Sequence, residues 1–355
     1  RRQRQMCIRD SFRSALAQNI AYCTYREELS AQEIAARLGV SPVYVESELD
    51  FLQKYGYMLE RKGKYRANIL IDEADETGKR INRLMDSMYA EAADVFANEL
   101  YVRLTEGGLL EKEGIACGRK GNKNFLLWAL IPYITANSGS KKDDISFEEV
   151  AVRRIDGSHD IAYADLEGSY EGIRYGDSMQ KWCGPSWVSL DGNMLWKCIS
   201  EEVCGERENS NFSEDLPRSE DLKLFLRMER GGMLSPDEYA SLAERGFIRM
   251  QGGCPVLQVV RIADRQTNDS LLAVGTQIRE KTAGAFKEIK SAYTRAVLEN
   301  TPEHLRPART FLLQYLFRMD GWFLIYVLKE LQESGRLAPP KEDEKKSLMT
   351  LIAPC

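Results

Sequence analysis

Near the N-terminus, signals that start, stop and restart a helix follow one another within a short stretch of chain. Ser30 and Glu33 form a capping box, in which the Ser side chain accepts from a backbone N–H of the helix and the Glu side chain accepts from the Ser N–H. Gly39 supplies a left-handed turn that residues with a Cβ resist, and Ser41-Pro42 then begins the next helix. Gly56 ends that helix, since glycine readily adopts the conformation beyond a helix C-terminus. This order predicts two helices joined by a tight turn.

Apolar residues at helical spacing indicate what these helices bury. Residues 8–25 predict a preceding amphipathic helix, because their apolar side chains recur along one face. In the helix predicted at 42–55, Val45, Leu49 and Leu52 fall on one face and are expected to be buried. The three helices are therefore expected to share one core.

A hairpin is predicted directly after these helices. Residues 57–61 and 65–71 are strand-like, and Lys62-Gly63-Lys64 lies between them. Glycine permits the tight turn that such a short connection requires.

The string LSAQEIAARLGVSPVYVESELDFLQKYGYMLERKGKYRANILI, residues 29–71, resembles the winged helix-turn-helix domains of ArsR- and MarR-like repressors. In that family the order is helix, turn, recognition helix and basic hairpin wing. The resemblance concerns the N-terminal fifth of the chain and implies a bacterial-type transcription regulator that binds double-stranded DNA, with residues 42–55 in the major groove. The residues that it implies at the duplex are Arg37, Ser41, Val43, Tyr44, Ser47, Lys54, Arg61, Lys62, Lys64 and Arg66.

The predicted recognition helix departs from this family by carrying carboxylates. Glu46, Glu48 and Asp50 stand where phosphates would repel them, unless a carboxylate accepts from a cytosine amino group. Winged helices also serve as protein-docking modules, so a protein-interaction module that does not bind DNA stays an alternative. The cations around the helix are then ordinary solvated surface charges.

Charge is unevenly distributed along the sequence. Residues 1–72 hold 12 Lys/Arg against 9 Asp/Glu, and residues 73–355 hold 37 against 45. A basic N-terminal domain, residues 1–72, followed by an acidic segment is typical of a protein whose N-terminal domain binds nucleic acid.

Beyond the head, apolar spacing from Glu73 to Leu104 predicts a long connecting helix. It either pairs across a homodimer or packs on its own chain. The segment 107–217 is rich in glycine and aromatic residues, and two Asp-Gly turns predict hairpins: 147–155 with 161–167, and 186–190 with 194–200.

Aromatic residues of this segment either fill the core of a small sheet or line a pocket for a small-molecule effector. The candidate pocket residues are Tyr163, Tyr175, Trp182, Trp187 and Trp196.

The last part of the chain contains a weak internal repeat of the N-terminal domain. Glu238, Leu242, Gly246 and Phe247 repeat the spacing of Glu48, Leu52, Gly56 and Tyr57, which predicts a second winged-helix-like segment. DNA contact is not expected there, because acidic residues lie along it. Residues 282–335 are predicted to be helical, and the charged segment 341–346 is expected to be solvated.

The sequence contains no phosphate-binding loop, dinucleotide fingerprint, nucleophile elbow or zinc-protease motif, and it has only two histidines. Its eight cysteines include no CxxC pair, so they are expected to be reduced thiols. We therefore predict no enzyme activity, no cofactor and no metal site. No window resembles a membrane span or a secretory signal, which predicts a cytoplasmic protein without membrane contact.

These observations predict a multidomain α+β protein. The expected domains are a winged helix-turn-helix at 1–72, a connecting helix at 73–106, a mixed module with hairpins at 107–217, and a second winged-helix-like segment with C-terminal helices at 218–355. The segments after the head are expected to form a body that senses a small-molecule or protein effector or that mediates oligomerisation.

Overall fold

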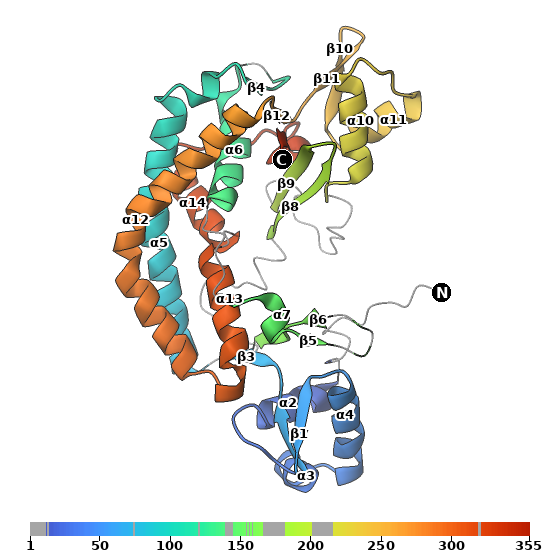
Figure 1. The fold of residues 1–355 in the computed structure, drawn as a ribbon, viewed down its shortest axis with the longest axis vertical. Helices are drawn as coiled ribbons and strands as arrows, with labels where there is room; N and C mark the ends of the chain where they lie inside the picture. The colour runs from blue at the N-terminus through green and yellow to red at the C-terminus, as the bar shows by residue number, and fades with distance from the viewer. Residues whose placement is uncertain are drawn as a thin grey trace. The chain divides into compact units, whose positions relative to one another are not determined.

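The computed structural model describes residues 12, 14–73, 75–119, 121–138, 145–153, 155, 157, 159–165, 182–200, 216–318 and 321–355. This part of the chain mixes helices and strands, as the α+β prediction requires (Figure 1). The chain divides into two compact units, each assembled from separate segments. Unit 1 comprises Arg1–Met85, Lys142–Glu171 and Ile289–Leu316, and unit 2 comprises Asp86–Lys141, Gly172–Glu288 and Phe317–Cys355.

The elements of unit 1 begin with the N-terminal helices and hairpin. They are α2 (Ala15–Cys23), α3 (Ala31–Leu38), α4 (Pro42–Lys54), β1 (Met58–Arg61), β2 (Lys64–Ala67), β3 (Leu70–Asp72), α7 (Phe147–Val150), β5 (Val152–Arg153), β6 (His159–Asp160), β7 (Tyr163–Asp165), the 3₁₀ helix η3 (Glu303–Leu305) and α13 (Arg306–Arg318), whose last residues belong to unit 2.

The elements of unit 2 include the strands of a five-stranded sheet. They are η1 (Leu109–Glu111), β4 (Ile115–Ala116), α6 (Lys123–Asn137), β8 (Trp182–Leu190), β9 (Asn193–Ser200), α10 (Ser219–Glu229), α11 (Pro236–Glu244), β10 (Ile248–Gln251), β11 (Cys254–Leu257), β12 (Val260–Ile262), α14 (Gly321–Glu333), η4 (Lys345–Ser347) and β13 (Thr350–Pro354).

Two long helices, α5 (Glu76–Thr105) and α12 (Arg265–Glu299), each contribute residues to both units. The long helix predicted at 73–104 is confirmed as α5. A helix was predicted to begin at residue 282, but α12 already begins at Arg265. Asp264 caps this helix, because its carboxylate accepts the Thr267 N–H at 2.8 Å. None of the helices that the structure describes is long and apolar enough to cross a bilayer.

We call residues 14–72 the head. Its capping box is confirmed: Ser30 Oγ accepts the Glu33 N–H at 3.3 Å, and Glu33 Oε2 accepts the Ser30 N–H at 2.7 Å. Pro42 begins α4 as predicted, although the side chain of Ser41 makes no capping hydrogen bond. The described part of the helix expected at 8–25 is α2, which is capped by Ser14.

The helices of the head share one core, which also includes Ala162 and Leu305. Val45, Leu49 and Leu52 are fully buried, as the spacing in α4 predicts, and they pack with Ile20 of α2 and Ile34 of α3. Because these residues come from all three helices, burying them fixes which face of α4 points outward.

The strand predicted at 65–71 is split in two. Asn68 interrupts it, because its N–H donates to Tyr57 O at 2.8 Å and its side chain donates to Gly56 O at 2.9 Å. β2 therefore pairs with β1, whereas β3 pairs in parallel with β7.

Gly39 between α3 and α4 has a φ of 68°, which confirms the predicted left-handed turn. A Cβ added there would meet no atom within 4 Å, so a substitution would cost backbone strain alone. Gly39→Val is expected to destabilise the head by about 1–2 kcal/mol, measured by thermal unfolding of the full chain. Gly39→Asn should cost clearly less, because Asn tolerates this conformation. Equal losses for the two variants would contradict the argument.

The hairpin predicted at 147–155 with 161–167 is wrong, because β7 in its second arm pairs with β3 and its first arm begins as a helix. Phe147–Val150 is a helix, and Ser146 Oγ donates to Glu149 Oε1 at 3.0 Å. Two glutamates in the first turn of α7 also suit the positive end of a helix. The short pair β5–β6 follows instead, and Asp156 of the predicted turn lies outside the described residues.

The sheet of unit 2 has the strand order β4-β12-β13-β9-β8. Its hairpin β8–β9 confirms the pairing predicted at 186–200, and the turn residues Asp191 and Gly192 have φ values of 50° and 69°. Trp196 on β9 is 1% exposed, and its ring packs edge-on against Tyr133 of α6 at 5.4 Å.

Unit 2 repeats the end of the head 190 positions later. Ile248 stands 190 positions after Met58, and β10–β11 has the register of β1–β2, with Ile248 opposite Leu257 as Met58 is opposite Ala67. Both hairpins turn through two residues of positive φ, Lys62-Gly63 and Gly252-Gly253. The two turns are therefore built alike.

The repeat continues on both sides of the hairpins. Tyr57 N donates to Leu52 O at 2.8 Å, and Phe247 N donates to Leu242 O at 2.9 Å. After each hairpin the order is a short strand, β3 or β12, and then a long helix, α5 or α12. Each short strand also pairs in parallel with a strand from later in the chain. The repeat that four residues predicted thus extends in the structure over a helix, a hairpin, a strand and a long helix.

Candidate nucleic-acid interface

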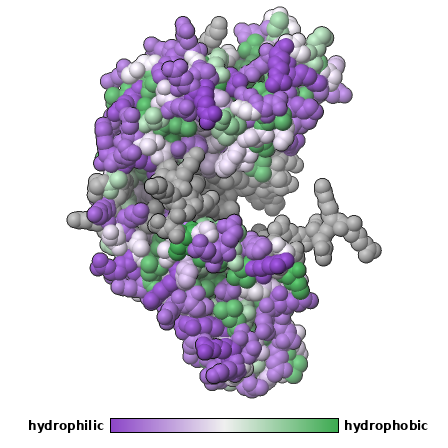
Figure 2. Space-filling model, viewed as in Figure 1, coloured by the Kyte–Doolittle hydropathy of each residue, from purple (hydrophilic) through white to green (hydrophobic). Residues whose placement is uncertain are grey.

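The first turns of α4 expose apolar side chains and serines on the outward face of the helix. Val43 is 70% exposed and Tyr44 is 68% exposed, and Ser41 and Ser47 are exposed beside them. The buried face of α4 holds these residues outward, because it packs on α2 and α3. Figure 2 shows apolar side chains breaking a largely hydrophilic surface on the visible face.

Exposed cations lie at the end of α4 and on the first hairpin. Lys54 is in the last turn of α4, and Arg61 and Lys62 lie at the tip of the β1–β2 hairpin. None of these three side chains forms an ion pair with a residue that the structure describes. Their charges are therefore available to a partner.

The other predicted cations are paired within the head. Arg37 forms an ion pair with Glu27, Lys64 lies 4.0 Å from a Glu33 oxygen, and Arg66 lies 3.8 Å from a Glu28 oxygen. The hydrogen bond from Arg37 lowers the pKa of Glu27, which keeps that carboxylate charged. The pairs of Arg37 and Lys64 are exposed and that of Arg66 is half-buried, so they only partly neutralise these cations.

Carboxylates share the surface between α4 and the hairpin. Glu48 is turned towards α2, where its Oε1 accepts from Ser14 Oγ at 2.8 Å. Glu46 and Asp50 are exposed, and burial together with the charges of Glu60, Asp50 and Glu46 raises the pKa of Tyr65 on β2. Carboxylates thus contribute to the electrostatics of the surface that carries the exposed cations.

The second copy lacks the cations of the first. Positions 190 residues after Lys54, Arg61, Lys62 and Lys64 are occupied by Glu244, Gln251, Gly252 and Cys254. The second hairpin has the same register with no basic residue at these four positions, so the register does not require the cations that stand there in the first copy.

Of the predicted aromatic residues, the structure brings Trp187 and Trp196 together, as directly opposed residues of β8 and β9. Tyr163 belongs to unit 1, whereas Trp182, Trp187 and Trp196 belong to unit 2. Trp196 fills the core and Trp187 is 59% exposed. Trp182 lies at the start of β8, and Tyr175 is outside the described residues.

Tyr163 instead joins a polar cluster that was not predicted from the sequence. Its hydroxyl donates to Asp72 Oδ2 at 2.5 Å, and Arg309 Nη2 donates to Asp72 Oδ1 at 2.6 Å. Burial opposes the charge of Arg309, but the Asp72 carboxylate and the surrounding tyrosines more than offset this and raise its pKa. Asp72 and Arg309 are 237 positions apart, and no local pattern connects them.

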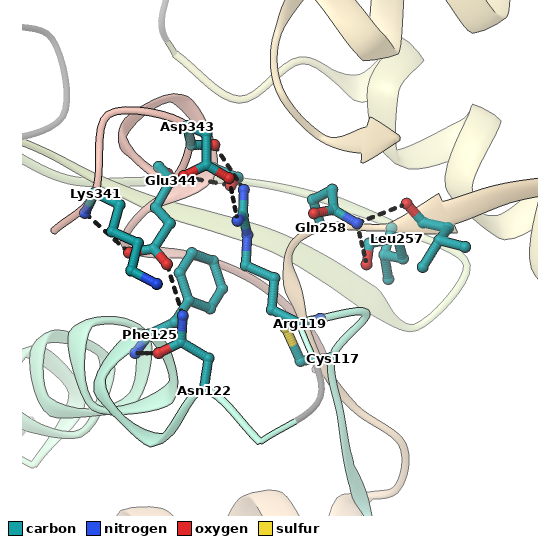
Figure 3. A network of polar contacts seen from close by, with 11 residues as sticks. Cys117, Arg119, Asn122, Phe125, Leu257, Gln258, Lys341, Asp343 and Glu344 are labelled. Carbon is teal, nitrogen blue, oxygen red and sulfur yellow. Dashed lines mark hydrogen bonds and ion pairs between the residues drawn. The ribbon is translucent and has the colours of Figure 1, made fainter. Parts of the chain in front are cut away.

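A second polar cluster holds the C-terminal segment in unit 2 (Figure 3). Asn122 Nδ2 donates to Glu344 Oε1 at 2.6 Å, and the Lys341 N–H donates to Glu344 Oε2 at 3.0 Å. Arg119 donates to Asp343 Oδ2 at 2.9 Å and lowers the pKa of that carboxyl. The segment 341–346 is therefore not simply solvated, as was expected: Glu344 is 2% exposed because it anchors the segment to the start of α6.

In the described part of the chain, no group of three or more His, Cys, Asp or Glu side chains is placed to hold a metal ion. No family model matches this chain, and no curated protein or solved structure matches it either.

Proposed function

We propose that this protein is a DNA-binding transcription regulator whose head is a winged helix domain. The observation that carries the proposal is the set of exposed cations Lys54, Arg61 and Lys62 beside the outward face of α4, which form no ion pair within the described part of the chain. The positions of these cations hold Glu244, Gln251 and Gly252 in the second copy, which supports a role other than folding for them. Phosphate groups are the natural partners of such a cluster.

In this proposal α4 enters the major groove and the first hairpin contacts the backbone beside it. Ser41, Val43, Tyr44 and Ser47 would meet base edges, and Arg37, Lys64 and Arg66 would exchange their carboxylate partners for phosphates. The chain after the head would act as the sensing or oligomerisation body of a cytoplasmic regulator.

The triple variant Arg61→Ala, Lys62→Ala, Lys64→Ala tests the role of the hairpin. It is expected to weaken binding to random-sequence duplex DNA by about tenfold or more, and to reduce the salt slope of log K by about 2–3. Fluorescence anisotropy over a range of salt concentrations measures both quantities. Far-UV circular dichroism should be unchanged, since these side chains are largely exposed.

The second hairpin supplies the matched control. Arg249→Ala with Gln251→Ala alters exposed residues of β10, and it should leave DNA binding unchanged. If the triple variant binds DNA as tightly as the wild type, or if the control loses as much affinity, the first hairpin is not the contact surface.

A second candidate function is protein docking by the same head. Exposed Val43 and Tyr44 next to Glu46 and Asp50 favour a partner with apolar and basic side chains rather than a phosphate backbone. Glu46→Gln with Asp50→Asn separates the two candidates. Removing two negative charges should strengthen binding to duplex DNA if α4 faces phosphates, and it should weaken binding to a basic protein partner.

A further inference from the structure

Unit 1 contains a cavity between the base of the head and three helices. It is lined by the end of β3, the first turns of α5, the end of α12 and Arg309 of α13. The cavity is small and open on one side. Its polar lining includes Asp72, Glu73, Asn82 and Asn300.

Arg309 brings a buried charge with unused hydrogen-bonding capacity to this cavity. The residue is 8% exposed, and its Nη2 donates to Asp72 Oδ1 at 2.6 Å. Its Nε is buried and has no hydrogen-bond partner among the described residues. A guanidinium has five N–H donors, so most of the donors of Arg309 are unfilled by the residues that the structure describes.

A second guanidinium contacts two residues that line the cavity, Glu73 and Asn300. Arg26, from the loop between α2 and α3, is paired with Glu73, and its Nη2 donates to Asn300 Oδ1 at 2.9 Å. Asn82, on the first part of α5, lines the cavity and makes no hydrogen bond to any described residue. Donors and acceptors therefore both remain for a ligand.

The charges around the cavity identify the kind of ligand. Two carboxylates, Asp72 and Glu73, are balanced by the guanidinium groups of Arg309 and Arg26. A ligand with a net charge would leave that charge uncompensated in a partly desolvated site. A zwitterionic ligand carries both charges and adds no net charge. A carboxylate is the best acceptor for the unused donors of Arg309, and an ammonium group is the best donor for Asp72 and Glu73.

We propose that this cavity binds the zwitterionic end of a free α-amino acid. The carboxylate lies against Arg309 and Asn300, the ammonium group lies against the carboxylates of Asp72 and Glu73, and the side chain points through the open side. The compact zwitterion suits the small cavity. Because Arg26 and Asp72 belong to the head, such a ligand would contact the head and the long helices together. The inference does not depend on DNA binding.

Isothermal titration calorimetry of the full chain tests this site. Each common L-amino acid is titrated separately, at up to about 10 mM, which detects even weak binding. At least one is expected to bind saturably. Acetate, methylammonium and glycerol, which carry one half of the zwitterion or neither, should bind at least about tenfold more weakly.

Two variants locate the binding. Asn82→Phe fills the cavity without touching the ion pairs and should weaken binding by about tenfold or more, while Arg83→Phe, at the exposed next position of α5, should leave it unchanged. Arg309→Lys keeps the charge but loses the planar fork, and it should also weaken binding about tenfold. If Asn82→Phe does not fold, the binding measured for Arg309→Lys tests the site instead. The proposal is overturned if no amino acid binds, if glycerol or acetate binds equally well, or if folded variants bind like the wild type.

Discussion

Leu49→Ala is expected to destabilise the head by roughly 2–5 kcal/mol, because it removes the contacts of a fully buried side chain and leaves a cavity. Leu49 lies at the centre of the α4 face that packs on α2 and α3. Hydrogen exchange of the head amides in the full chain measures the change, since it reports the stability of this region separately.

Glu46→Ala is the matched control on the same helix. Its side chain is exposed, so the stability of the head should change by less than about 0.5 kcal/mol. If Glu46→Ala destabilised the head as much as Leu49→Ala does, the outward face of α4 would be assigned wrongly, and the proposed groove-facing residues would fail with it.

Asp72→Ala is expected to cost about 3 kcal/mol, because it leaves the buried guanidinium of Arg309 without its carboxylate. The side chain of Asp72 is 34% exposed, so solvent screens part of the interaction and a cost at the lower end of the range for buried pairs is appropriate. Urea unfolding of the full chain measures this loss.

The double variant Asp72→Ala with Arg309→Met gives the control for this prediction. Methionine fills similar space without a charge, so the double variant should recover much of the stability that Asp72→Ala loses. If the two changes were simply additive, the ion pair would not account for the loss.

The local structure of the head could be predicted because it depends on neighbouring residues. A capping box, a glycine of positive φ and a proline at a helix start act within a few positions, and the spacing of Val45, Leu49 and Leu52 selects the buried face. The same reasoning failed at Phe147–Val150, where the helix-favouring Ser146 and Glu149 outweighed the β-forming residues around them.

The repeat was harder to see in the sequence, because its two copies share geometry more than residue types. Turn geometry and burial are preserved when Tyr57 is replaced by Phe247 or Lys62 by Gly252. Four matched positions were therefore all that the sequence offered. The parallel pairings of β3 with β7 and of β12 with β13 depend on segments far apart in the chain, which local patterns do not specify.

In the candidate sites, too, single residues could be predicted from the sequence, whereas contacts between distant residues could not. The cations of the first hairpin could be listed from the sequence, but the ion pairs of Arg37, Lys64 and Arg66 depend on which carboxylates the fold brings near. The Asp72–Arg309 pair unites residues from β3 and α13, and only the structure places them together.

The salt dependence of duplex DNA binding by the wild-type chain tests the central claim most directly. If Lys54, Arg61, Lys62 and Lys64 contact phosphates, log K should fall linearly with log salt concentration, with a slope of roughly −3 to −4. Absent binding in dilute salt, or a flat dependence on salt, would contradict the proposal that the head binds DNA.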